Sequence, residues 1–149
     1  MEKVVGTLEE LQAEAKAFVA TLSPKAGNAT LVTLSGELGA GKTSFTQGLA
    51  RALGVNDHVT SPTFVLEKVY DLPEDAGRGF ARLIHIDAYR LESGAGLGPL
   101  RFDELQQDPL NLIVLEWPER VSDALPTPDH ALTLTVRPDT ARSISYTYA

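Results

Sequence analysis

The sequence predicts a three-layer α/β domain with a central, mostly parallel sheet, antiparallel edge strands and flanking helices. Three observations support this fold class. A strand, a glycine-rich loop and a helix follow one another directly over residues 29–53, and short apolar runs recur further along the chain. Residues 131–148 alternate apolar and polar side chains around a turn, as in an antiparallel hairpin. No repeat or linker interrupts the 149 residues, so we expect one domain over residues 1–149.

The first elements have clear boundary signals. Thr7-x-x-Glu10 has the form of a capping box and predicts a helix from Thr7. Apolar residues follow at helical spacing, namely Leu8, Leu11, Ala15, Phe18, Val19 and Leu22. Residues 29–34 are rich in β-branched side chains and predict a buried strand. A second helix should begin at Lys42, because Phe45, Leu49 and Leu53 share one helical face before Gly54.

The middle of the chain predicts a strand pair followed by irregular structure. Residues 63–70 and 81–86 have strand composition, and the polar loop 71–79 between them favours a hairpin. Residues 93–99 contain three glycines and should be irregular.

The last third of the chain predicts short helices and strands in alternation, followed by a strand pair. Residues 102–107 favour a short helix, and the apolar run 111–115 is a central strand candidate. Residues 118–125 look helical, with Pro118 tolerated in the first turn. Residues 131–137 and 143–148 should then pair as an antiparallel hairpin.

Composition and charge exclude several classes of function. The chain has no cysteine, so disulfides, cysteine nucleophiles and Cys-ligated metals are ruled out, and His58, His85 and His130 lack metal-ligand spacing. A net charge of -7 without any basic run disfavours direct binding to nucleic acid. The longest uncharged stretch, residues 26–36, is far shorter than the ~20 apolar residues that span a bilayer. With no readable secretory signal, we expect a cytoplasmic protein without membrane contact.

The most specific motif is Gly36-Glu37-Leu38-Gly39-Ala40-Gly41-Lys42-Thr43, which matches G-x-x-x-x-G-K-[ST] between a strand and a helix. Its glycines let backbone N–H groups turn toward phosphate oxygens, beside the positive end of the following helix. The Lys42 ammonium would reach the β- and γ-phosphates, and the Thr43 hydroxyl would bind Mg²⁺. The motif therefore predicts a nucleoside triphosphate site in a P-loop NTPase-like fold.

Two acids at predicted strand ends complete this hypothesis. Residues 112–116 are four apolar residues followed by Glu116, the form of a Walker-B strand, so Glu116 would hold Mg²⁺ directly or through water. Asp87 ends the other strand and could position or deprotonate the attacking water. The alternatives are a helix N-terminal charge for Glu116 and an exposed strand-end acid for Asp87. His85 shares a strand face with Asp87 and could support the reacting groups from behind, but we favour a structural role over a catalytic one.

Two further features stay open on chemical grounds. Thr60, Ser61 and Thr63 surround Pro62, and their hydroxyls could sense a γ-phosphate as a switch or simply form a Ser-Pro turn. Trp117 could belong to the core, stack on a nucleotide or contact a partner.

Four segments together resemble the TsaE family. They are Gly-Glu-Leu-Gly-Ala-Gly-Lys-Thr at 36–43, Ser-Pro-Thr-Phe at 61–64, His-Ile-Asp-Ala-Tyr-Arg-Leu at 85–91 and Glu-Trp-Pro-Glu at 116–119. The resemblance implies an ATPase of low intrinsic activity that bacteria require for threonylcarbamoyladenosine synthesis on tRNA, acting with TsaB and TsaD. ATP binding and hydrolysis would drive engagement and resetting of the TsaB–TsaD pair. The transferase chemistry and the tRNA contact would belong to the partners.

The resemblance also implies roles for individual residues. Thr43 and Glu116 match the family's Mg²⁺ positions, Asp87 matches the acid tied to hydrolysis, and Arg142 matches a basic nucleotide contact. The phosphate contacts match Gly39, Ala40, Gly41, Lys42, Thr43 and Ser44, and the switch-like segment matches Thr60, Ser61 and Thr63. One stretch departs from the pattern, because residues 99–102 lack the acid expected soon after Leu97-Gly98.

Other nucleotide-binding classes fit less well. A small-molecule kinase usually needs a basic lid, and Arg78, Arg82, Arg90 and Arg101 do not cluster in the sequence. A guanine-specific switch protein would need an Asn-Lys-x-Asp motif, which the chain lacks. A nucleotide-gated binding module with negligible hydrolysis stays an alternative.

Overall fold

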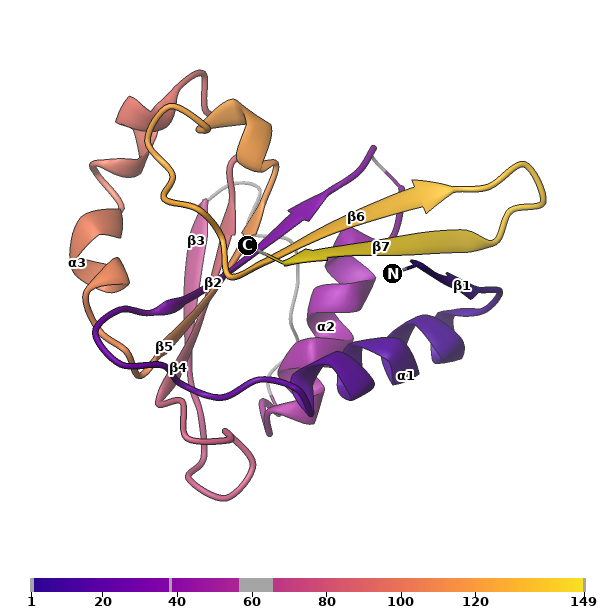
Figure 1. Ribbon diagram of the computed structural model, residues 1–149, viewed down its shortest axis with the longest axis horizontal. Helices are drawn as coiled ribbons and strands as arrows, with labels where there is room; N and C mark the ends of the chain where they lie inside the picture. Colours follow the sequence, from indigo (N-terminus) through magenta and orange to yellow (C-terminus); the bar gives the residue numbers. More distant parts are fainter. Residues whose placement is uncertain (1, 38, 57–65, 149) are drawn as a thin grey trace.

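The computed structural model describes residues 2–37, 39–56 and 66–148, and builds them around one seven-stranded sheet (Figure 1). The strands are β1 (Glu2–Val5), β2 (Thr30–Ser35), β3 (Glu67–Asp71), β4 (Arg82–Asp87), β5 (Asn111–Glu116), β6 (His130–Val136) and β7 (Arg142–Tyr148). Their order across the sheet is β1-β7-β6-β2-β5-β4-β3.

Parallel strands occupy the centre of the sheet and antiparallel strands its edges. β2 pairs in parallel with both β6 and β5, and β5 pairs in parallel with β4. β3 is antiparallel to β4 at one edge, while β7 and β1 continue antiparallel from β6 at the other. The mostly parallel sheet with antiparallel edges that the sequence predicts is confirmed.

Helices cover both faces of the sheet (Figure 1). α1 (Leu8–Val19) and α2 (Lys42–Ala52) pack together on one face. The other face carries α3 (Phe102–Gln106) and the short 3₁₀ turns η1 (Gly94–Leu97) and η2 (Pro118–Arg120). No helix in the described part of the chain has the length and apolar character that crossing a membrane requires.

The central strands alternate their side chains between the two cores. On β5, Leu112 and Val114 face the core under α1 and α2, while Ile113 and Leu115 face the opposite core. All six residues of β5 are buried, as expected for a parallel strand covered on both sides. The same alternation directs the residues at the ends of β4 and β5 toward α2.

Both ends of α1 are held by side chains. The Thr7 Oγ1 atom accepts a hydrogen bond from the Glu10 N–H at 3.1 Å, and Glu10 Oε2 accepts one from the Gly6 N–H at 3.2 Å. The Thr7 bond agrees with the predicted capping box, whereas Glu10 accepts from the residue before the cap and not from the Thr7 N–H. At the other end, Arg78 donates to the backbone oxygens of Ala20 and Leu22, 3.1 Å away in each case.

Two local predictions need correction, and one strand was not predicted. The helix predicted over 118–125 is wrong, because only Pro118–Arg120 form a 3₁₀ turn and further turns follow. The helical turn ends because Val121 has non-helical backbone, with φ -129° and ψ 21°. Residues 93–99 are not wholly irregular, since η1 lies within them. β1 was not predicted, and the start of the expected strand 63–70 lies outside the described residues.

Candidate functional site

The glycine-rich loop joins β2 to α2 at the carboxyl end of the parallel strands. Gly41 caps α2 with φ 103°, which is left-handed backbone, and no side chain caps this helix end. A Cβ atom on Gly36 would lie 2.4 Å from the Leu134 backbone oxygen, so only glycine fits there. The N–H groups of the first turn of α2 have no partner within the helix, and they are suited to bind an anion.

Lys42 lies inside the loop that precedes it. Its side chain is buried at 5% exposure, and Nζ donates to the backbone oxygens of Gly36 and, at 3.2 Å, Glu37. The ammonium also lies 4.1 Å from the centroid of the Trp117 ring. Burial lowers the pKa of Lys42, while its carboxylate neighbours oppose that shift, namely Glu116, Glu119 and Asp87. The loop therefore holds a cation that also faces several acids.

The two predicted acids occupy neighbouring positions at the ends of β4 and β5. Asp87 pairs with Glu116 in the parallel register, which places the two residues on adjacent strands about 4.8 Å apart. Asp87 is 6% exposed and Glu116 2%, so Asp87 is not an exposed strand-end acid. Asp87 Oδ1 accepts a hydrogen bond from the Tyr89 N–H at 3.0 Å. Glu116 Oε2 lies 2.5 Å from His85 Nε2.

Trp117 directly follows β5 and joins an aromatic stack. Its backbone is left-handed, with φ 60°, an uncommon conformation for a bulky residue. The Tyr89 and Trp117 ring centroids are 5.0 Å apart, and the Arg120 guanidinium carbon lies 5.3 Å from the Tyr89 ring centroid. Trp117 thus links the buried lysine to residues of the surface, and it is also packed against the core.

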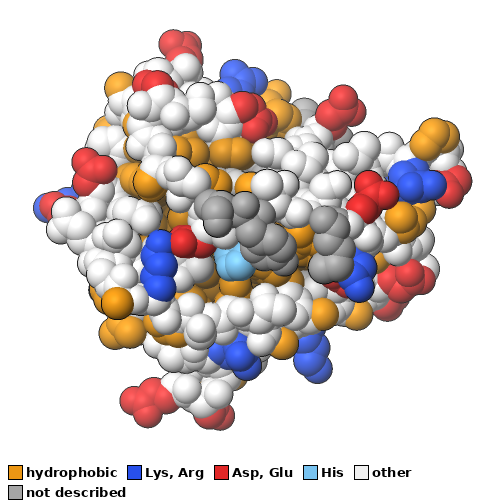
Figure 2. Space-filling view, viewed as in Figure 1, with side chains coloured by type: hydrophobic (Ala, Val, Ile, Leu, Met, Phe, Trp, Pro, Cys, Tyr) orange, Lys and Arg blue, Asp and Glu red, His pale blue; other side chains and the backbone are white. Residues whose placement is uncertain are grey.

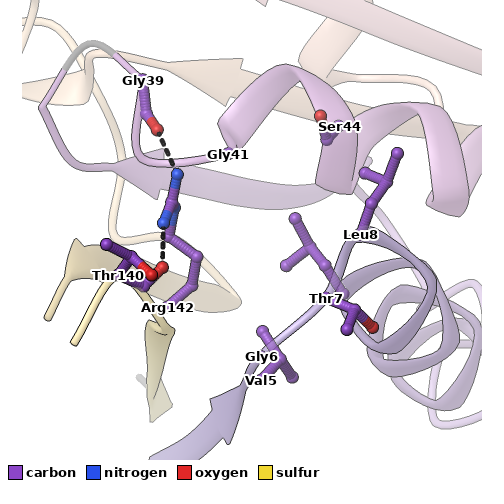
Figure 3. A pocket seen from close by; sticks show the side chains of 10 residues that line it. Val5, Gly6, Thr7, Leu8, Gly39, Gly41, Ser44, Thr140 and Arg142 are labelled. Atoms are coloured by element: carbon purple, nitrogen blue, oxygen red, sulfur yellow. Dashed lines mark hydrogen bonds between the residues drawn. The ribbon is translucent and has the colours of Figure 1, made fainter.

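Arg142 lies beside the loop although it belongs to β7. It donates to the backbone oxygen of Gly39 at 3.2 Å and to that of Thr140 at 2.5 Å (Figure 3). Its side chain is half-buried, as are those of Thr43 and Ser44. The loop residues at one end of the sheet and the arginine from the C-terminal strand are thereby brought together.

A pocket of about 250 Å³ opens where Arg142, the loop and the start of α1 meet (Figure 3). It is lined by Val5, Gly6, Thr7, Leu8, Leu11, Gly39, Gly41, Ser44, Thr140 and Arg142. The sequence analysis missed the N-terminal members and Thr140. No local motif marks them, because pairing of β1 with β7 brings three distant segments together.

The oxygen donors at the loop suit a hard divalent cation. No group of three histidine, cysteine or acidic side chains that could hold a metal is found in the described ranges. Mg²⁺ in nucleotide sites is bound by one or two protein oxygens together with substrate phosphates, so such a group is not needed. The carboxylates of Asp87 and Glu116 supply negative charge that Lys42 alone does not balance. These residues fit Mg²⁺.

Two further sequence predictions concern the residues Thr60, Ser61 and Thr63 and the segment 97–102. Thr60, Ser61 and Thr63 fall outside the described residues. In the segment 97–102, Leu97 and Phe102 are buried in the core that faces α3.

Figure 2 shows one face of the molecule, on which Lys and Arg side chains lie apart from one another among acidic side chains.

These features define an α/β protein with a glycine-rich loop between a strand and a helix, and two buried acids at neighbouring strand ends. A family model described as "Threonylcarbamoyl adenosine biosynthesis protein TsaE" matches residues 6–144. The chain belongs to the TsaE family.

Curated relatives support this family assignment, and the share of each chain that the match covers differs between them. A TsaE protein of Rickettsia bellii is 33% identical over 147 residues, covering 98% of this chain and 94% of that protein. One from Streptomyces coelicolor is 48% identical over 90 residues, covering 60% of this chain and 57% of the relative. The chain thus matches only a little more than half of the Streptomyces protein, as it does for the relative from Synechocystis, at 56%.

A solved structure extends the likeness to the fold. The crystal structure of Bacillus subtilis YdiB matches with a TM-score of 0.75 at 30% sequence identity. The match covers 99% of this chain and 84% of that one.

Proposed function

We propose that this protein is the ATPase component of bacterial tRNA threonylcarbamoyladenosine biosynthesis. It binds and hydrolyses Mg-ATP in order to act on and reset a TsaB–TsaD complex, and it is not itself the transferase. The observation that carries the proposal is the convergence of buried Lys42 with Asp87 and Glu116 at the open end of α2. The names of the curated relatives support the pathway.

Phosphate binding follows from the loop. The N–H groups between Gly39 and Ser44 surround the phosphate oxygens, and Lys42 exchanges its two backbone oxygens for phosphate oxygens. Arg142 stabilises the loop through Gly39. The adjoining pocket, with apolar Val5 and Leu8 and polar Thr7, is placed to receive the nucleoside.

Thr43 and Glu116 are the proposed Mg²⁺ ligands. When bound, Mg²⁺ neutralises charge that develops on the β- and γ-phosphate oxygens. The Thr43 hydroxyl and the Glu116 carboxylate provide the hard oxygen donors that this ion requires. Glu116 is fixed at the end of a buried strand, so its oxygen is presented from the rigid part of the molecule.

Asp87 is the proposed residue that activates water. Its hydrogen bond from the Tyr89 N–H orients the carboxylate, and burial keeps bulk water from competing for it. A carboxylate in this position holds a water molecule and accepts its proton during attack on the γ-phosphate. Lys42 contributes by stabilising the negative charge of the transition state.

Contact with tRNA is assigned to the partners. The net charge of -7 opposes binding of a polyanion to this chain alone. Trp117 and the segment Thr60–Thr63 are the candidates for coupling nucleotide state to TsaB–TsaD, and the cytoplasm is the proposed location.

Mixing the purified protein with TsaB–TsaD tests the proposal. We expect a complex on size-exclusion chromatography that depends on ATP, and phosphate release that the partners stimulate. Absence of any nucleotide-dependent complex would contradict the partner assignment. Formation of a phosphorylated metabolite would indicate a kinase, and a complex without phosphate release would indicate a nucleotide-gated module.

The variant Asp87→Asn separates binding from hydrolysis. Asparagine keeps an oxygen that can accept from the Tyr89 N–H but loses the basic carboxylate. We expect ATP affinity within about threefold of wild type, and a loss of hydrolysis of about 100-fold or more. The control is Asp103→Asn, an exposed acid on α3, which should change neither quantity. Retention of both activities in Asp87→Asn would make Asp87 structural.

A further inference from the structure

His85 is a buried polar residue that the proposed mechanism does not use. Its side chain is fully buried, at 0% exposure, in the middle of β4. Nε2 lies 2.5 Å from Glu116 Oε2 on the neighbouring strand. His85 is registered with Val114, two residues before Glu116, so the two polar side chains are diagonal neighbours on one face.

The direction of this hydrogen bond follows from the donor inventory. An ionised carboxylate only accepts, so His85 Nε2 carries the hydrogen and donates to Glu116. The other ring nitrogen, Nδ1, is buried and has no hydrogen-bond partner among the described residues. An unpaired N–H group would be costly there, which places the lone pair on Nδ1 and the proton on Nε2.

The surroundings of His85 do not by themselves call for a polar residue. Leu83, Leu112 and Val114 on the same face belong to the apolar core. Burying an imidazole among such side chains is unfavourable unless it is hydrogen-bonded. The hydrogen bond made here goes to the carboxylate that is the proposed Mg²⁺ ligand. A histidine at this position is therefore explained by its hydrogen bond to Glu116, which can hold the carboxylate in place.

We propose that His85 is a positioning residue that holds Oε2 of Glu116, so that Oε1 is the oxygen presented to the Mg²⁺ of the bound nucleotide. This inference rests on the proposed function. His85 fixes the rotation of the carboxylate from an adjacent strand before the ligand arrives. Outer partners of this kind typically change metal affinity by about 10- to 100-fold when they are removed.

Nucleotide affinity with and without Mg²⁺ provides the test. The dissociation constant of ADP is measured by calorimetry in Mg²⁺ and in EDTA. The value in EDTA divided by the value in Mg²⁺ is the ratio that reports metal coupling. We expect His85→Leu, which removes the donor, to reduce this ratio about tenfold or more while the value in EDTA changes less than about twofold. His85→Gln places an amide N–H near the position of Nε2 and should restore most of the ratio.

Controls keep the result specific. Ile84→Val, a conservative change on the opposite face of β4, should leave the ratio unchanged. If His85→Leu fails to fold, His85→Asn replaces it, because the asparagine amide is too short to reach Glu116. The ratio of the dissociation constants should then be lower in His85→Asn than in His85→Gln. Thermal melting of each variant verifies the fold.

The outcomes separate the two proposals. An unchanged ratio in the variant that lacks the donor, or an equal loss in Mg²⁺ and EDTA, overturns the role of His85. A wild-type protein that binds no ADP in either condition overturns the proposed function itself. Nitrogen-15 spectra of the protein without nucleotide give an independent readout: a hydrogen on Nε2 supports the inference, and its absence from Nε2 contradicts it.

Discussion

Lys42 is held by interactions that a phosphate group would replace. In the ligand-free protein its ammonium is satisfied by the oxygens of Gly36 and Glu37 and by the Trp117 ring. In the proposed function, a nucleotide would exchange these contacts for charge-assisted hydrogen bonds to phosphate, which are about twice as strong as neutral ones. The lysine is therefore already positioned in the loop and needs only a local movement.

Replacement of this lysine should weaken nucleotide binding. Lys42→Ala removes charge-assisted contacts that contribute about 1.5 to 3 kcal/mol, so we expect affinity for Mg-ATP to fall roughly ten- to hundredfold. Isothermal titration calorimetry measures the change. Lys16→Ala, an exposed lysine on α1, is the matched control. Unchanged affinity in Lys42→Ala would refute the assignment of the loop.

Alkaline pH should weaken binding through the same residue. Burial lowers the pKa of Lys42 from its ordinary value of 10.5, with Glu116, Glu119 and Asp87 opposing the shift. Above that lowered pKa the free protein carries a neutral amine, and binding must take up a proton. Affinity should therefore begin to fall at a pH below 10.5, by up to about tenfold per pH unit.

Calorimetry between neutral pH and pH 11 measures this effect. The dependence on pH should be lost in Lys42→Ala, which has no group to deprotonate at that position. A wild-type affinity that stays constant through pH 10.5 would contradict the account.

At the scale of elements, the contact between α1 and α2 depends on a helical glycine. A Cβ atom at Gly48 of α2 would lie 3.0 Å from Gln12 Cα and 3.1 Å from Ala15 Cβ on α1. The backbones of the two helices therefore approach closely at this point. Because α2 begins at the glycine-rich loop, this packing also fixes the position of Lys42.

A larger side chain at this contact should destabilise the fold. Gly48→Val forces the helices apart, and we expect the free energy of unfolding to fall by about 1–3 kcal/mol. Urea denaturation followed by circular dichroism measures the loss. Ala13→Val, on the exposed surface of α1, controls for the helix propensity of valine and should cost about 0.5 kcal/mol. Equal losses in the two variants would mean that the close contact is not important.

Elements with strong local signals were predictable from the sequence, and those that depend on distant pairing were not. The capping box at Thr7 and the apolar run of β5 are local signals, and both elements formed as expected. β1 is short and mostly exposed, and it is a strand only because β7 pairs with it. The predicted helix after Pro118 did not form, because residues 118–124 make successive tight turns instead of a continuous helix.

The placement of the candidate site residues in the fold was partly predictable for a related reason. The loop residues are contiguous, and strand ends are where acids meet in a parallel sheet, so Asp87 and Glu116 were placed correctly as neighbours. The bond between His85 and Glu116 depends on the register of two strands, which no single-strand pattern reveals. The pocket wall from Val5 to Leu8 likewise required the three-dimensional fold.

At the scale of the whole molecule, one chromophore can report occupancy of the site. Trp117 is the only tryptophan in the chain, and its ring lies over the Lys42 ammonium. We expect its fluorescence to change saturably on titration with Mg-ATP, because the lysine moves toward phosphate. Trp117→Phe should abolish the signal. A flat titration of wild-type protein, under conditions where calorimetry detects binding, would show that Lys42 keeps its contact with the ring.

The position of β4 and β5 inside the sheet limits how the site can adapt. Each strand has hydrogen-bonded neighbours on both sides, so the backbone at Asp87 and Glu116 cannot shift without breaking the ladder. If the protein binds nucleotides as proposed, differences in the number of phosphates would be accommodated on the side of the loop and α2. Complexes with a monophosphate, a diphosphate and a triphosphate would superpose closely on the strands and diverge at residues 36–41.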